Sequence, residues 1–169
     1  MLQSFREANR LTSRNYQKLF ISAAEIPGLQ LQDADTLVFV DDFSGTGSQV
    51  VEFWPATQEL IASEAKTFLI LAATTADAKS RIERETSLKV YTNKILGNNR
   101  NVFGENSQLF DARARTKLLR YCTLADKKAP KGFGECGLLF AFSHTTPNNS
   151  LPILHASKRT WRGLLPRVL

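Results

Sequence analysis

The sequence predicts an α/β protein with a three-layer, mainly parallel sheet. Short apolar runs such as Leu37–Val40 and Thr67–Ala73 are typical of buried strands. Between the runs lie segments of helical periodicity, each roughly 10 to 15 residues long, which is the spacing of βαβ units. Strands that are joined in this way form a parallel sheet, and the connecting helices cover its faces.

The individual elements are predicted from apolar periodicity and from helix breakers. Residues 2–24 carry apolar side chains mostly at three- and four-residue steps, which predicts an amphipathic helix that Pro27 and Gly28 end. Four strands are predicted, near 36–41, at 67–73, from 88 to 91 or 95, and at 137–143. The helices between them are predicted near 47–63, where Pro55 interrupts or kinks the helix, at 76–86, which is exposed, and at 107–125. Loops are predicted at 97–107 and 127–135.

Length and composition favour one domain. The chain has 169 residues, with 43% hydrophobic and 22% charged residues, which is typical of a globular protein with a proper core. No apolar stretch reaches the roughly 18 residues of a membrane helix, and the N-terminus does not resemble a secretory signal. The predicted parts of this domain, 1–169, are an N-terminal helix in 1–30, an α/β core at 36–145 and a Pro-containing C-terminal segment at 146–169.

The most informative segment is the first predicted strand and the loop after it. The strand ends on two adjacent carboxylates, Asp41 and Asp42, and a loop of small residues leads into the next helix. The open amides at a helix N-terminus attract a phosphate group. The residues expected to hold the phosphate through glycine backbone, hydroxyl groups and amides are Ser44, Gly45, Thr46, Gly47, Ser48 and Gln49.

The two acids suit a different part of a ligand. Carboxylates repel phosphate, but they accept hydrogen bonds from sugar hydroxyls or bind a Mg²⁺ ion that accompanies a phosphorylated ligand. Sugar on one side of the site and phosphate on the other therefore suggest a phosphoribosyl site. An ordinary strand-to-helix turn with solvated Asp41 and Asp42 remains the alternative.

Other phosphate motifs fit this segment less well. A P-loop needs a lysine, but none follows Gly47. A dinucleotide fingerprint needs a small residue where Val50 stands and an acid about 20 residues further on, whereas Asp77 lies too far away. Adjacent acids exclude an Asp-x-Asp phosphatase, and a receiver domain gives no reason for the Gly-Thr-Gly sequence.

This arrangement resembles the phosphoribosyl-pyrophosphate signature of the type I phosphoribosyltransferases. That pattern is an apolar strand, two acids, a few residues, Thr-Gly, one residue and Thr; here Thr46 and Gly47 match, and Gln49 replaces the final Thr. The resemblance implies that Asp41 and Asp42 hold the ribose 2- and 3-hydroxyls. It also implies that the following loop wraps the 5-phosphate, with one hydroxyl ligand fewer because of Gln49.

A second resemblance involves the C-terminal part of the chain. Residues 132–154 contain Thr146-Pro147-Asn148-Asn149, and Trp161 follows. Together with the acidic pair, this is similar to phosphoribosyltransferase-like domains of bacterial conflict systems, often found with anti-phage components. The resemblance spans about 36–167 and implies a cytoplasmic subunit of a defence complex with a protein partner.

One departure from the phosphoribosyltransferases affects the expected activity. These enzymes have strands ahead of the acidic-pair strand, which carry a pyrophosphate-binding loop and a flexible hood. Only 35 residues precede Thr36, and they predict a helix and a linker. The chain is therefore expected either to be one piece of a split enzyme or to bind its ligand without transferring it.

Further candidate residues follow other predicted elements. Asp77 and His144 follow predicted strands and are candidates for the cleft and for a general base, although neither can be assigned that role. Asn148 and Asn149 either line the cleft or form a structural turn. Cys122 and Cys136 have no metal-ligand spacing, so we expect idle thiols in a reducing cytoplasm.

The net charge of +6 is unevenly distributed. Residues 1–85 carry a net charge of −4, and residues 86–169 carry +10. A basic half attracts polyanions, so a nucleic acid or an acidic partner is a candidate for docking there, although a solvated helix face is the alternative. A non-catalytic subunit that senses a nucleotide and docks through this half is the main alternative to an enzyme.

Overall fold

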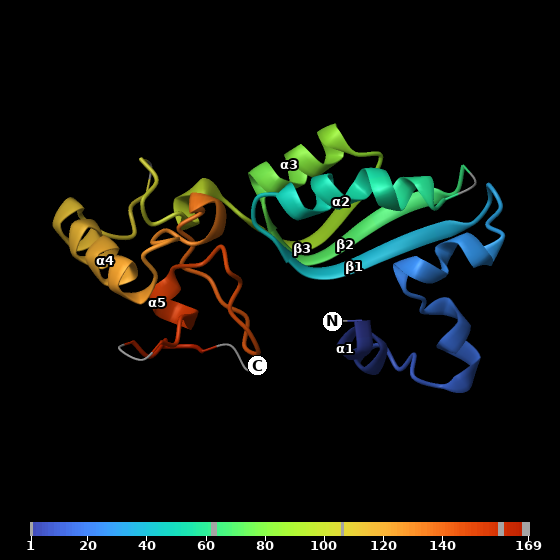
Figure 1. The fold of residues 1–169 in the computed structure, drawn as a ribbon, viewed down its shortest axis with the longest axis horizontal. Helices are drawn as coiled ribbons and strands as arrows, with labels where there is room; N and C mark the ends of the chain where they lie inside the picture. The colour runs from blue at the N-terminus through green and yellow to red at the C-terminus, as the bar shows by residue number, and fades with distance from the viewer. Residues whose placement is uncertain (1, 62–63, 106, 159–160, 167–169) are drawn as a thin grey trace. The chain divides into compact units, whose positions relative to one another are not determined.

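The computed structural model describes residues 2–61, 64–105, 107–158 and 161–166 (Figure 1). The chain divides into two compact units, Met1–Ile95 and Leu96–Leu169. The expectation of a single domain over 1–169 stays a prediction. In the described part of the chain, no helix combines the length and the apolar character that crossing a membrane requires.

The first unit is built on a three-stranded parallel sheet in the order β1-β2-β3, which confirms the predicted α/β fold class. The strands are β1 Thr36–Ser44, β2 Lys66–Thr75 and β3 Lys89–Leu96. β1 pairs with β2 from Thr36↔Lys66 to Ser44↔Thr74. Because this pairing continues past the two acids, β1 ends three residues later than the sequence predicts. Within the described residues 2–35 no strand precedes β1, as predicted.

Two helices, α2 Ser48–Glu59 and α3 Ala76–Glu85, cover one face of the sheet (Figure 1). Alternate residues of the strands point to this face, as in any pleated sheet. The buried core beneath the helices consists of Trp54, Leu69, Leu71, Ile82, Leu88 and Val90. Pro55 does not interrupt the helix, since α2 continues through it, and the alternative of a kink there stays a prediction. Proline removes one main-chain donor, and burial of the neighbouring Trp54 offsets that loss.

The N-terminal segment differs from the single predicted helix. It contains α1 Leu2–Ala8 and two 3-10 helices, η1 Arg14–Leu19 and η2 Ala23–Leu29. Arg10 has a φ of 57°, a conformation that no α-helix contains, and so ends the first helical stretch. Ser22 starts η2, since its amide and hydroxyl donate to the Glu25 carboxylate at 2.7 and 2.8 Å.

The second unit contains α4 Ala112–Ala125, α5 Pro152–His155 and two short 3-10 helices, η3 Asn98–Arg100 and η4 Phe133–Glu135. Its core consists of Val102, Cys122, Ala125, Leu151, Ile153 and Leu154. α4 begins later than the predicted residue 107 because the Asp111 carboxylate accepts a hydrogen bond from the Ala114 amide at 2.7 Å and caps the helix.

The predicted strand at 137–143 is wrong. Only Leu138 forms bridges in this segment, to Asn101 and Ser150. Gly137 has a φ of 54°, which is not a strand conformation. The Phe142 amide then donates to Thr145 O at 2.8 Å and closes a turn, so the run is irregular chain, of which only Gly137 and Leu138 are buried.

Candidate functional site

The predicted phosphate loop connects β1 to α2, and Gly47 determines its shape. Gly47 has φ 72° and ψ −8°, a left-handed conformation that favours glycine, and stands at the N-cap of α2. A Cβ atom at this position would lie 3.1 Å from Ala78 O and 3.1 Å from Ile82 Cγ1. The loop therefore turns directly against α3, and both its conformation and its packing require glycine.

Two threonines at the end of β2 hold the start of the loop. The buried Thr74 hydroxyl donates to Ser44 O at 2.8 Å, and the Thr75 hydroxyl donates to Gly45 O at 2.8 Å. Thr75 Oγ1 also accepts a hydrogen bond from the Ala78 amide at 3.0 Å, so it caps α3. The carboxyl ends of β1 and β2 thus meet at one edge of the sheet, where ligands bind in parallel α/β sheets.

The loop leaves hydrogen-bond donors at the start of α2. The Ser48 amide donates to Thr46 Oγ1 at 3.3 Å. The amides of Gln49 and Val50 have no hydrogen-bond partner among the residues that the structure describes. Unpartnered amides in the first turn of a helix are the groups that bind an anion.

Asp41 and Asp42 lie inside β1 rather than after it. Asp41 pairs with Leu71, and because side chains alternate along a strand, Asp41 and Asp42 point to opposite faces. Asp41 Oδ1 accepts a hydrogen bond from the Asp42 amide at 2.8 Å. Asp41 also lines a shallow pocket of about 240 Å³ whose other walls include Phe53 and Trp54. The two carboxylates therefore present separate surfaces to a ligand.

Burial raises the pKa of the Asp41 carboxyl above its usual value. The hydrogen bond from the Asp42 amide opposes this shift, and the neighbouring Asp42 charge adds to it. The side chain retains contact with solvent, so the desolvation is partial. Asp41 thus holds its proton more tightly than a free aspartic acid does, and the ionised form needed to accept sugar hydroxyls appears at a higher pH.

Arg81 on α3 is a loop contact that the sequence did not reveal. Its Nη1 donates to Ser48 Oγ at 2.8 Å and to Thr46 O at 3.4 Å. Its Nε donates to Glu85 at 3.2 Å, which orients the guanidinium group. A fixed positive charge consequently lies next to the loop that is expected to bind phosphate.

The remaining predicted residues lie in different places. Asp77 is exposed in the first turn of α3, in the same unit as the loop. His144 is exposed in the second unit and stacks on Phe142 with ring centroids 5.5 Å apart. Because Asp77 belongs to the first unit and His144 to the second, the expected gathering of the two around one cleft stays a prediction.

The Asn pair is divided between the surface and the interior of the second unit. Asn148 is exposed, whereas Asn149 is only 5% exposed. Asn149 Nδ2 donates to Phe133 O at 3.1 Å and to Cys136 Sγ at 3.5 Å. These bonds favour the structural interpretation for Asn149, since buried amides are normally satisfied by the protein.

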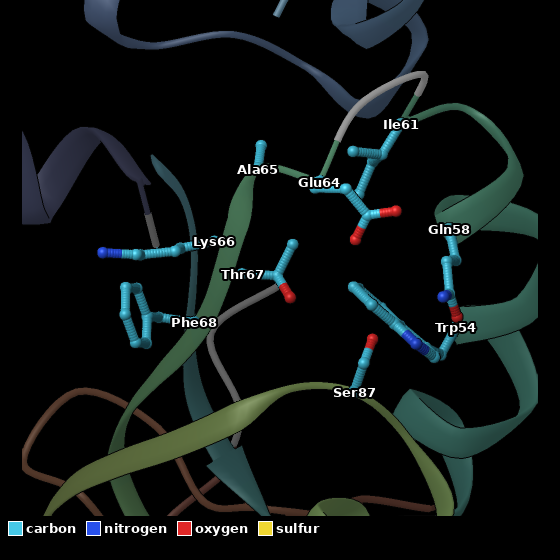
Figure 2. A pocket seen from close by; sticks show the side chains of 9 residues that line it. All are labelled: Trp54, Gln58, Ile61, Glu64, Ala65, Lys66, Thr67, Phe68 and Ser87. Atoms are coloured by element: carbon cyan, nitrogen blue, oxygen red, sulfur yellow. The ribbon is translucent and has the colours of Figure 1, made fainter. Parts of the chain in front are cut away.

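A larger groove, of about 590 Å³, lies at the other end of the sheet, between α2 and the start of β2 (Figure 2). Figure 2 shows the hydroxyls of Thr67 and Ser87 and the Gln58 amide around it. Trp54 Nε1 is buried without a hydrogen-bond partner in the described structure. None of the predicted site residues lines this groove, which lies at the amino ends of the strands.

The PRTase-CE family model matches residues 1–167. No curated protein and no solved structure matches the chain.

Proposed function

We propose that this chain, which belongs to the PRTase-CE family of phosphoribosyltransferase-like domains, binds phosphoribosyl pyrophosphate or a related nucleotide. The observation that carries the proposal is the left-handed Gly47 at the start of α2, which leaves the Gln49 and Val50 amides without partners at the strand-end edge. Family membership and the adjacent acids together favour a ligand with both ribose and phosphate.

Each part of the site has a distinct role in this proposal. The amides and hydroxyls of the Ser44–Gln49 loop bind the 5-phosphate. Asp41 and Asp42 accept hydrogen bonds from the ribose hydroxyls. The charge on Asp41 is required for its contact, so we expect binding to weaken at acidic pH.

The residues fit a Mg²⁺ ion that arrives with the ligand. Among the described residues no group of three or more His, Cys, Asp or Glu could hold a metal by itself. Mg²⁺ is commonly bound by one or two carboxylates together with substrate phosphates. Asp41 or Asp42 would supply the protein ligand, and the ion would neutralise the charge of the pyrophosphate.

Transfer needs more than the described site supplies. Transfer of ribose 5-phosphate to a nitrogen nucleophile passes through a transition state that resembles an oxocarbenium ion. We propose that a partner protein in a bacterial defence complex supplies the pyrophosphate-binding loop. The defence role rests on the resemblance of the acidic pair and Thr146–Asn149 to domains of conflict systems.

A second candidate function has its own observation. Residues 86–169 carry a net charge of +10, and most of them belong to the compact unit Leu96–Leu169. This arrangement favours a non-catalytic subunit that senses a nucleotide with the first unit and docks on an acidic protein or a nucleic acid with the second.

Calorimetry with phosphoribosyl pyrophosphate and Mg²⁺ tests the proposal. We expect binding that the double variant Asp41→Asn/Asp42→Asn abolishes. Glu52→Gln, an exposed carboxylate on α2, is the control that should bind normally. Pyrophosphate release on adding a nitrogen base supports the enzyme, and binding without release supports the sensor. No binding, together with salt-sensitive retention of DNA or RNA, would contradict both and favour nucleic-acid binding.

A further inference from the structure

We infer that Arg81 positions the hydroxyl groups of the Ser44–Gln49 loop as phosphate donors and makes the site selective for a phosphorylated sugar. The inference deepens the proposed function and rests on it. Arg81 lies 35 residues after Thr46 in the sequence, yet its Nη1 donates to Thr46 O at 3.4 Å and to Ser48 Oγ at 2.8 Å. The guanidinium group thus contacts the loop at two points.

The direction of these hydrogen bonds determines what the loop can offer a ligand. A hydroxyl group has one hydrogen to donate and two lone pairs to accept with. Ser48 Oγ accepts from Arg81, and Thr46 Oγ1 accepts from the Ser48 amide at 3.3 Å. In the described part of the chain neither hydroxyl donates to a protein acceptor. Both hydrogens therefore remain available for a phosphate oxygen.

Two neighbouring groups keep Arg81 in this orientation. The Glu85 carboxylate accepts from Arg81 Nε at 3.2 Å and from Arg84 Nη2 at 2.6 Å. Arg84 thus shares the negative charge of Glu85, so the guanidinium of Arg81 is only partly neutralised. Because arginine stays protonated at all relevant pH values, the loop keeps a permanent cation beside the unpartnered amides at the start of α2.

Arg81 acts through the loop and is therefore a positioning residue. A phosphate that binds the Gln49 and Val50 amides lies next to Ser48, whose hydroxyl separates it from Arg81. The attraction between the guanidinium and the phosphate grows with the charge of the phosphate. Arg81 should consequently favour the dianion of a sugar phosphate over its monoanion.

Calorimetry of the full chain with ribose 5-phosphate, without Mg²⁺, tests this at pH 5 and pH 8. The second ionisation of such a phosphate occurs at about pH 6. At pH 8 we expect Arg81→Gln to bind about tenfold more weakly than the natural chain, and Arg81→Lys to recover most of the loss. Lys79→Gln, which removes a positive charge from the same helix where Lys79 pairs with Glu83, is the control that should bind normally.

The pH dependence of ribose 5-phosphate binding distinguishes an electrostatic role of Arg81 from a purely structural one. The natural chain should bind more tightly at pH 8 than at pH 5, and Arg81→Gln should lose most of that gain. The titration of Asp41 is common to both proteins and cancels in the comparison. Ser48→Ala keeps the charge but removes the hydroxyl, so we expect weaker binding with the pH gain retained.

Three results would overturn the inference in different ways. Equal binding by the natural chain and Arg81→Gln refutes the role of Arg81 and leaves the proposed function intact. Weaker binding of Arg81→Gln with an unchanged pH gain indicates a purely structural role and refutes the charge argument. Failure of the natural chain to bind both ribose 5-phosphate and phosphoribosyl pyrophosphate refutes the proposed function itself.

Discussion

The two units of the chain are stabilised in different ways. In the first unit, main-chain pairing between β1 and β2 runs from Thr36↔Lys66 to Ser44↔Thr74, with an apolar core under two helices. In the second unit, buried polar side chains hold irregular chain: Ser150 Oγ donates to Phe140 O at 2.6 Å, and Thr146 Oγ1 donates to Leu165 O at 3.1 Å. Regular pairing tolerates many sequences, whereas such side-chain bonds need particular residues.

The largest expected effect is that of Gly132→Ala in the second unit. Gly132 has a φ of 78°, and a Cβ atom there would lie 2.6 Å from both Asn149 O and Ser150 O. We expect a loss of about 3 kcal/mol in the free energy of unfolding, from backbone strain and overpacking. Hydrogen exchange followed by mass spectrometry should show faster exchange in the second unit while the amides of β1 and β2 stay protected. Equal loss of protection in both units would show that they unfold together.

A smaller effect is expected for Thr74→Val in the first unit. Thr74 is fully buried and donates to Ser44 O, so the variant leaves a buried carbonyl without its partner. We expect a loss of about 2 kcal/mol in the free energy of unfolding, measured by urea denaturation. Thr123→Val on α4 is the matched control, because Thr123 makes the same kind of bond, to Leu119 O, at an exposed site. Similar losses of unfolding free energy in both variants would mean that burial does not determine the cost of removing the hydroxyl.

The pH dependence of stability should be visible at Asp41. Burial raises its pKa in the folded state, so ionisation destabilises the fold. This cost is absent below the unfolded pKa of about 3.9 and grows as the pH rises through the folded pKa. We expect Asp41→Asn to be more stable than the natural chain at pH 7 and equally stable near the unfolded pKa. Urea denaturation across this range measures the difference; a constant difference at every pH would contradict the stated cause.

The smallest predicted effect concerns thiol reactivity and leaves stability unchanged. Cys122 is fully buried, and burial raises its pKa to about 11, whereas Cys136 is half-buried. We expect iodoacetamide at pH 8 to modify Cys136 in the native protein and to leave Cys122 unmodified. Peptide mass spectrometry measures the two rates, and both thiols should react in urea. Rapid modification of native Cys122 would show that the core of the second unit opens readily.

The sequence predicted the regular first unit better than the second. The apolar runs at 36–41 and 67–73 became β1 and β2, because buried parallel strands need little beyond an apolar pattern. The run at 137–143 has the same pattern but forms no strand, since Gly137 has a positive φ and the Ser150 hydroxyl donates to Phe140 O. The conformation of this run depends on contacts between residues that are distant in the sequence, and local periodicity gives no information on such contacts.

The same limit applies to the candidate site. The loop could be predicted because its glycines and acids are adjacent in the sequence. Arg81 could not, since its neighbours predict an exposed helix with alternating charges, and only the packing of α3 on the loop brings it to Ser48. Whether Asp77, His144 and the Asn pair share a site with the loop stays a prediction.

The hydroxyl of Thr75 joins two parts of the chain through one oxygen atom. It accepts from the Ala78 amide at the start of α3 and donates to Gly45 O. A ligand that reduces the motion of the loop should therefore also reduce fraying at the start of α3. The NMR signals of the first-turn amides of α3 should then change when a ligand binds the loop. A solution NMR spectrum could thus detect a bound molecule before its identity is known.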